Sequence, residues 1–283
     1  MTTPLQVLDR PATRIRGVLV FLLIAFGIAW TGMIGAPLLG LSIVSPLVQL
    51  PFAFAPAIAA IVVRRWVTRE GFAGAGLALR LRPCWRSYLI AWLGPLWLVA
   101  TTLVLATALG WWAPDLTPLG DVVPGLPWWA FVAVLMVVVP LLTPIYWGEE
   151  FGWIDLRMRL FPGRPLAATL ATGLVWSVWH YPLAFVGYID FDNVPLGLAI
   201  WTGWFLAQQV LLSWLRIRSG SIWPTSLAHA GNNMVLSLLV GDLLRPSGLD
   251  DTALTLLMAV ATAVAAGWVV ATGRLTRVTQ SPR

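Results

Sequence analysis

The sequence predicts an all-α, polytopic membrane protein with about eight transmembrane helices. Apolar residues make up 59% of the 283 residues and charged residues only 11%, whereas a soluble domain carries about 25% charged residues. The apolar residues fall in long, uninterrupted blocks, which argues against the alternating pattern of a membrane β-barrel. A block of about 20 residues is long enough to cross the hydrocarbon layer as a helix.

Eight such blocks follow one another along the chain, separated by short charged stretches. The first block follows three arginines as a secretory signal would, but it is too long for one and no small-residue cleavage site follows. We therefore expect a single transmembrane domain over residues 17–273, between a cytoplasmic N-terminal segment (1–16) and a cytoplasmic tail (274–283). The predicted crossings are residues 17–40, 46–63, 87–110, 128–148, 166–187, 195–215, 221–241 and 252–272.

The distribution of charge predicts that both termini are cytoplasmic. All 18 basic residues are arginines, and eight crossings place 17 of them on one side of the membrane, with Arg245 alone on the other. Loops rich in arginine stay in the cytoplasm. The net charge of +6 thus indicates topology in a plasma or inner membrane and contact with anionic headgroups, so we expect no nucleic-acid partner. The opposite loops hold Asp115, Asp121, Asp190, Asp192, Asp242, Asp250 and Asp251.

A few polar residues fall at membrane depth. Glu149 and Glu150 end the fourth block, His180 lies in the fifth, and His229 lies in the seventh with Asn233 four residues later. Placing an acid or base in the middle of a membrane helix costs about 2.5–3.5 kcal/mol of insertion free energy, so its presence indicates a function.

The spacing predicts that these side chains meet in one polar pocket. Glu149 and His180 lie at similar distances from the turn between their blocks, so an antiparallel hairpin places them at similar depth. Glu150 is rotated by about 100° from Glu149, so only one of the two can face a given partner. His229 and Asn233 share one helix face because they are four residues apart.

Each of these residues also has a structural interpretation. A lone membrane histidine often hydrogen-bonds a neighbouring helix, and an asparagine near a helix end often packs helices together. The two glutamates could extend to the interface beside Arg157 and Arg159. Because all these polar groups occur together, we expect a functional site.

This set of side chains suits hydrolysis of an amide bond. A carboxylate can act as the general base that removes a proton from water. Histidine and asparagine can donate to the developing oxyanion, a role worth about 2.7–4 kcal/mol per donor. Glu149, His180 and His229 would alternatively bind zinc, a divalent metal, with an open position for water, and the sequence does not choose between the two. The single cysteine, Cys84, excludes an internal disulfide and a Cys-rich metal site.

Other chemistries fit less well. The sequence has no His-Glu-x-x-His helix, no pair of intramembrane aspartates and no Gly-rich phosphate loop. A proton-coupled transporter that uses Glu149 as a relay is an alternative, although no internal repeat or pair of broken helices supports it.

The same residues resemble three motifs of the CAAX-processing and bacteriocin-processing (CPBP) intramembrane protease family, which includes the type II CAAX prenyl endopeptidases. Its Glu-Glu-x-x-x-Arg motif matches in part at Glu149-Glu150. Its Phe-x-x-x-His motif matches at Trp176 to His180, with Trp in place of Phe, and its His-x-x-x-Asn motif matches at His229 to Asn233. The three follow one another in the family's order within about residues 140–240.

The resemblance implies an intramembrane endopeptidase in a bundle of about eight helices. Its substrate would be a peptide or membrane protein in the lipid bilayer, lipidated in some members. By resemblance, Glu149 is the base and His180 helps to hold the water. His229 and Asn233 form the oxyanion site, and Glu150 supports them.

A second motif residue differs. The motif arginine is replaced by Ile154, and Arg157, nearly one turn further on, is the expected substitute. The difference favours a second alternative, a non-catalytic membrane scaffold or immunity protein of the same fold. For a protease, we expect the site to open toward the cytoplasmic leaflet, because the hairpin turn and the arginines lie there.

Overall fold

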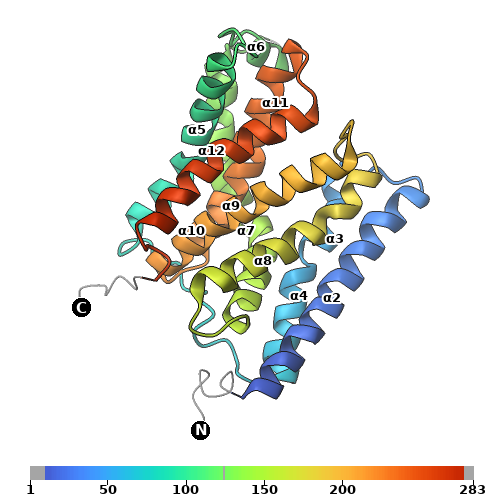
Figure 1. The fold of residues 1–283 in the computed structure, drawn as a ribbon, viewed down its shortest axis with the longest axis vertical. Helices are drawn as coiled ribbons and strands as arrows, with labels where there is room; N and C mark the ends of the chain where they lie inside the picture. The colour runs from blue at the N-terminus through green and yellow to red at the C-terminus, as the bar shows by residue number, and fades with distance from the viewer. Residues whose placement is uncertain (1–9, 124, 277–283) are drawn as a thin grey trace.

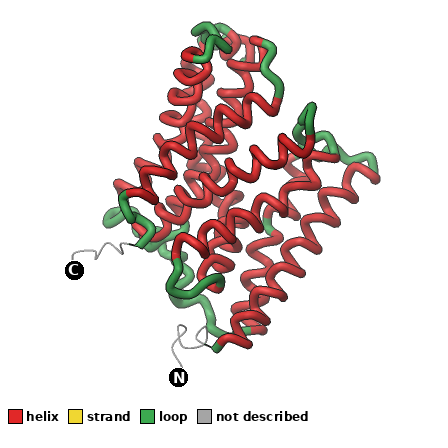
Figure 2. Tube along the Cα trace, in the orientation of Figure 1, coloured by secondary structure: helices red, strands yellow, loops and turns green. Residues whose placement is uncertain are grey.

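The computed structural model describes residues 10–123 and 125–276, which form helices and no strand (Figure 1; Figure 2). The predicted all-α fold is thereby confirmed, and each predicted block coincides with a helix or a run of helices. The elements are α2 (Pro11–Leu38), α3 (Pro46–Ala53), α4 (Ala55–Val62), the π-helical η1 (Val63–Val67), α5 (Trp85–Ala108), α6 (Pro118–Val122), α7 (Trp128–Arg159), α8 (Pro165–His180), the 3₁₀-helical η2 (Tyr181–Phe185), α9 (Val194–Ser219), α10 (Trp223–Gly231), the π-helical η3 (Asn232–Ser237), α11 (Leu238–Leu244), the 3₁₀-helical η4 (Arg245–Ser247) and α12 (Asp251–Ala271).

Six helical segments of the described chain are long and apolar enough to cross a membrane: α2, α3 to η1, α5, α7, α9 and α12. The multi-pass membrane character is thereby confirmed. The two other predicted crossings are α8, which has 16 residues, and residues 223–244, which η3 divides. The number of crossings, the cytoplasmic termini and the domain bounds stay predictions, and residues 1–9 and 277–283 of the terminal segments, Arg277 and Arg283 included, lie outside the described residues.

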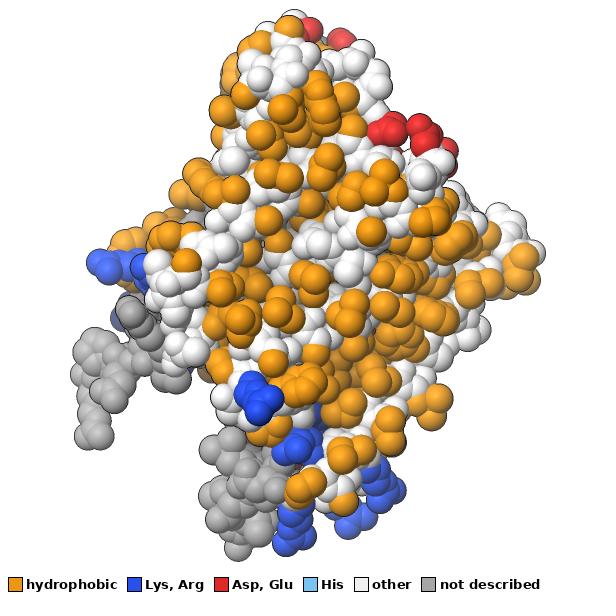
Figure 3. Space-filling view, in the orientation of Figure 1, with side chains coloured by type: hydrophobic (Ala, Val, Ile, Leu, Met, Phe, Trp, Pro, Cys, Tyr) orange, Lys and Arg blue, Asp and Glu red, His pale blue; other side chains and the backbone are white. Residues whose placement is uncertain are grey.

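Apolar side chains cover the outside of the bundle between two differently charged ends. Leu23, Leu38 and Leu141 are 75%, 81% and 73% exposed, which suits hydrocarbon because lipid tails are as apolar as leucine. Figure 3 shows arginines at one end of the molecule and acidic residues at the other. We call them the arginine-rich end, where α2 begins and α7 ends, and the acidic end, where α12 begins.

Helix α7 contacts α2, α4, α8 and α10, and its residues 148–156 are buried inside the bundle. Two glycines let α4 approach it closely, as small residues do between membrane helices. A Cβ added at Gly148 would lie 3.0 Å from the carbonyl oxygen of Ala53, and one added at Gly152 would overlap Pro56. The contact fixes α4 against the turn of α7 that carries the two predicted glutamates.

The helices that carry the histidines are both interrupted. Helix α8 ends at His180, before the predicted residue 187, and the chain continues as η2. Pro182 explains the early end, because proline cannot donate the backbone hydrogen bond that an α-helix needs. The π-helical η3 begins at Asn232, just after His229, and such turns within helices are frequent at functional sites.

Candidate active site

The two glutamates lie on a buried stretch of α7. Glu149 is 7% exposed and Glu150 is 1% exposed. The arginines near the end of the helix have other partners, since Arg157 donates to Thr169 and Arg159 to an acid on its own helix. An interfacial role for the glutamates beside these arginines therefore has no support in the structure.

Two tryptophans hydrogen-bond one oxygen of Glu149. The Nε1 of Trp176, on α8, donates to Oε2 at 2.9 Å, and the Nε1 of Trp153, one turn further along α7, donates to the same atom at 3.4 Å. The residue that replaces the motif's phenylalanine thus supplies a donor that phenylalanine lacks. Sequence reasoning identified Trp176 by its spacing but missed this contact.

Glu150 has a different partner, as its rotation about the helix predicts. Its Oε1 lies 2.9 Å from the Nδ1 of His229, and both side chains are at most 3% exposed. A carboxylate that contacts one ring nitrogen fixes the orientation of an imidazole. It also determines whether the other ring nitrogen carries a proton. The ring of His229 also packs against Tyr146 and Trp176, with centroid distances of 5.0 and 5.2 Å.

His180 is oriented by its own helix. Its Nδ1 lies 3.0 Å from the carbonyl oxygen of Trp176. Because a carbonyl only accepts, Nδ1 carries a proton and Nε2 is left for another partner. The ring stacks on Phe205 of α9, with 4.5 Å between the centroids.

A cavity of about 530 Å³ brings the predicted residues together. Glu149, His180, His229 and Asn233 all line it, while Glu150 is buried behind His229. The hairpin of α7 and α8 supplies the first two residues, and the segment of α10 and η3 supplies the next two.

Further polar residues line the same cavity, among them Tyr146, Tyr188 and Gln208. Sequence reasoning missed all three. Tyr146 could have been found from its position three residues before Glu149, on the same face of α7. Gln208 gave no comparable signal, because its place depends on how α9 packs against the bundle.

The cavity extends toward the acidic end of the molecule. Its lining includes Ile189, Arg245 and Asp251, and the last two form an ion pair of 2.9 Å. On α7 the lining residues lie at or before Glu149, and residues 150–156 are all buried. The prediction that the site opens toward the arginine-rich end is therefore wrong, because packing closes α7 on that side.

The zinc site that the sequence left open as an alternative has no support in this arrangement. Within residues 10–123 and 125–276, no three His, Cys, Asp or Glu side chains form a group that could hold a metal ion. We therefore derive the chemistry of the site without a metal.

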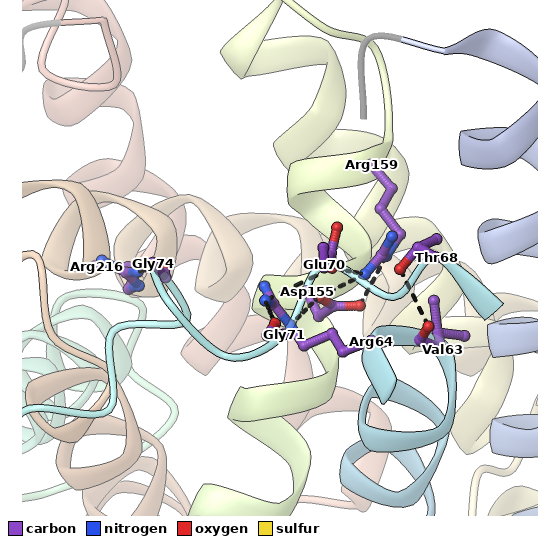
Figure 4. A network of polar contacts seen from close by, with 9 residues as sticks. All are labelled: Val63, Arg64, Thr68, Glu70, Gly71, Gly74, Asp155, Arg159 and Arg216. Atoms are coloured by element: carbon purple, nitrogen blue, oxygen red, sulfur yellow. Dashed lines mark hydrogen bonds and ion pairs between the residues drawn. The ribbon is translucent and has the colours of Figure 1, made fainter. Parts of the chain in front are cut away.

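Four buried charged residues hold the arginine-rich end of α7 (Figure 4). Asp155 lies 2.7 Å from Nε of Arg64 on η1 and accepts from Arg159 at 2.8 and 3.0 Å. Arg159 also pairs with Glu70, in the loop after η1. All four side chains are at most 3% exposed. We call them the charge network; Figure 4 shows its two acids between its two guanidinium groups.

The charge network accounts for the missing motif arginine. Ile154 is 2% exposed and packs in the apolar core. The expectation that Arg157 substitutes is wrong, because its Nε donates to the Thr169 hydroxyl of α8 at 2.9 Å. Arg64 and Arg159 instead hold the motif helix through Asp155.

The comparison with protein families agrees with the motifs. Residues 124–235, less than half of the chain, match the model described as type II CAAX prenyl endopeptidase Rce1-like. The matched range contains both glutamates, both histidines and Asn233. A search of the curated proteins found no match. The predicted resemblance is thereby confirmed: through its site-bearing region, the chain resembles the Rce1-like type II CAAX prenyl endopeptidases.

Proposed function

We propose that the protein is an intramembrane endopeptidase that hydrolyses a peptide bond of a membrane-associated substrate with water activated by Glu149. One observation carries the proposal: a buried carboxylate faces the same cavity as two histidines and an asparagine. Its neighbouring donors are neutral indoles rather than arginines. The carboxylate is therefore not neutralised by an ion pair and can accept a proton.

The reaction needs one water molecule and no covalent intermediate. Water bound between Glu149 and Nε2 of His180 loses a proton to the carboxylate as its oxygen attacks the carbonyl carbon. The developing oxyanion accepts hydrogen bonds from His229 and Asn233. Glu149 then delivers the proton to the amide nitrogen, the carbon–nitrogen bond breaks, and a carboxylic acid and an amine leave.

Glu150 acts through His229. To donate to the oxyanion, the imidazole needs a proton on Nε2, which lies opposite the nitrogen that contacts Glu150. Glu150 favours that form either as the counter-ion of an imidazolium or as a donor to Nδ1. We therefore assign it a positioning role.

The two alternative functions have less support. A non-catalytic scaffold was favoured by the missing motif arginine, but the charge network holds the motif helix without it. A proton relay across the membrane needs a continuous polar path on both sides of Glu149, whereas the cavity has no lining residue on α7 beyond Glu149.

Cleavage of a panel of fluorogenic membrane peptides by purified protein in detergent tests the proposal. Glu149→Ala and His180→Ala should each abolish cleavage, with and without a chelator. Asp115→Ala is the matched control, because hydrogen bonds from Thr117 lower the pKa of the Asp115 carboxyl and this exposed acid is ionised. Full cleavage by Glu149→Ala, or none by folded wild type across the panel, contradicts the proposal.

A further inference from the structure

We propose that the substrate reaches Glu149 from the extracytoplasmic side of the membrane, and that it is a membrane-anchored peptide whose cleaved bond lies on that side. The inference rests on the proposed function and adds the direction of access. It combines the shape of the cavity with the distribution of arginine.

The shape of the cavity gives the route. Its walls run from Glu149 to the first turn of α12 and the loop after η2, through residues such as Ser237, Tyr188 and Asp251. Tyr188 is 43% exposed and the side chain of Arg245 is 60% exposed. Water and a polar peptide backbone therefore have a path from the acidic end to the glutamate.

The opposite route is closed. Beyond Glu149 on α7, Trp153 and Leu156 are fully buried, and the charge network ties the end of the helix to η1 and its following loop. A substrate that came from the arginine-rich end would have to open this packing and separate buried ion pairs, which is strongly unfavourable because it leaves buried charges without partners.

The arginines orient this route in the membrane. They gather at the closed end of the molecule (Figure 3), and arginine-rich loops stay in the cytoplasm. The mouth of the cavity therefore faces the extracytoplasmic side. The sequence could not give this result, because it predicts the depth of the site but not which end of the helices spreads apart.

The rim of the cavity indicates an anchored substrate rather than a soluble one. Leu50 of α3, Ile145 of α7 and Leu238 of α11 line it and are 40%, 38% and 39% exposed. Exposed apolar side chains beside a polar mouth suit a chain that lies partly in lipid. The hydrophobic anchor of the substrate would lie against this rim while the bond to be cleaved enters.

Cysteine accessibility tests the direction of access without requiring catalysis. Cys84 is buried and is replaced by serine, and single cysteines are introduced by Ser237→Cys and Tyr188→Cys in the cavity. Leu79→Cys, at a 50% exposed position in the loop before α5, marks the arginine-rich end. A charged, membrane-impermeant maleimide is then added to right-side-out and inverted membrane vesicles.

We expect both cavity cysteines to react at least tenfold faster in right-side-out vesicles, and Leu79→Cys to show the opposite preference. Reaction of Ser237→Cys mainly in inverted vesicles would overturn the proposal, and so would its failure to react in either preparation while Tyr188→Cys is labelled. Labelling is independent of cleavage, so a failure of the proposed function would appear separately, as an inactive folded protein in the peptide assay.

Discussion

Helix α7 carries two groups of buried charged residues that differ in how their charges are paired. In the charge network, two acids and two arginines are in direct contact and are at most 3% exposed. One and a half turns earlier, Glu149 accepts hydrogen bonds from two neutral indoles and lines a cavity. An acidic side chain of the same helix thus has charged partners in one place and neutral partners in the other.

The difference separates a structural role from a chemical one. Buried charges that are fully paired hold elements together, and removing one partner is strongly destabilising. A carboxylate that neutral donors hold, beside a cavity, remains able to take up a proton from water. The charge network therefore holds α7 in place, and this placement keeps Glu149 beside the cavity.

The largest effect on stability is expected for Asp155→Ala. This change leaves Arg64 and Arg159 with one acid between them, and we expect a loss of about 3–5 kcal/mol in the free energy of unfolding. Thermal unfolding in detergent, followed by tryptophan fluorescence, measures it, with Asp115→Ala as the control. The double variant Asp155→Ala/Arg64→Ala restores the balance of charge and should recover part of the loss. An unchanged Tm of Asp155→Ala would contradict the structural role of the charge network and thus its difference from the site around Glu149.

The next effect concerns Trp176→Phe, which restores the aromatic residue of the family motif. It removes the 2.9 Å hydrogen bond to Glu149 and keeps most of the apolar contact. A hydrogen bond to a charged group contributes about 1.5–3 kcal/mol, so we expect kcat/KM to fall by about 10- to 100-fold with little change in Tm. Trp179→Phe, which loses a bond to the Ala25 carbonyl instead, is the matched control. Equal activity of Trp176→Phe and wild type would show that this bond does not position the base.

A smaller effect is expected for Glu150→Gln. The amide can still contact Nδ1 of His229, but it removes the negative charge that favours a proton on the ring. We expect kcat to fall by about tenfold, KM to change little and the alkaline limb of the pH profile to move to lower pH, because the ring loses its proton more readily without the neighbouring negative charge. A variant with a normal pH profile would leave Glu150 with a packing role only.

The smallest effect is expected from a chelator. Because the side chains do not form a three-ligand group in the described chain, treatment with a strong zinc chelator should leave cleavage unchanged. Activity measured before and after dialysis checks this, with metal content determined in parallel. Loss of cleavage that returns on addition of zinc would assign Glu149 to a metal-bound mechanism.

The sequence predicted the membrane fold and the members of the site for related reasons. Long apolar blocks define helices, and few polar residues are tolerated within them, so Glu149, His180 and His229 were conspicuous. Helical spacing then predicted which of them share a face. Both inferences use local rules, and the cavity agrees with them.

Other features depend on contacts between distant parts of the chain. Arg64 and Glu70 precede Asp155 by more than eighty residues, so no local pattern links them, and Arg157 was a natural but wrong choice. The direction of the cavity likewise depends on how α8, α9 and α11 pack around it. These are properties of packing, which periodicity along one helix does not encode.

The most direct test of the account is the behaviour of Glu149→Gln in two assays on one preparation. The amide keeps the shape of the side chain and can still accept from both indoles, but it cannot take a proton from water. We predict a fall in kcat/KM of about 10²- to 10⁴-fold, with a Tm equal to that of wild type. A variant that cleaves normally, or one that loses activity only because it unfolds, would contradict the assignment of Glu149 as the base.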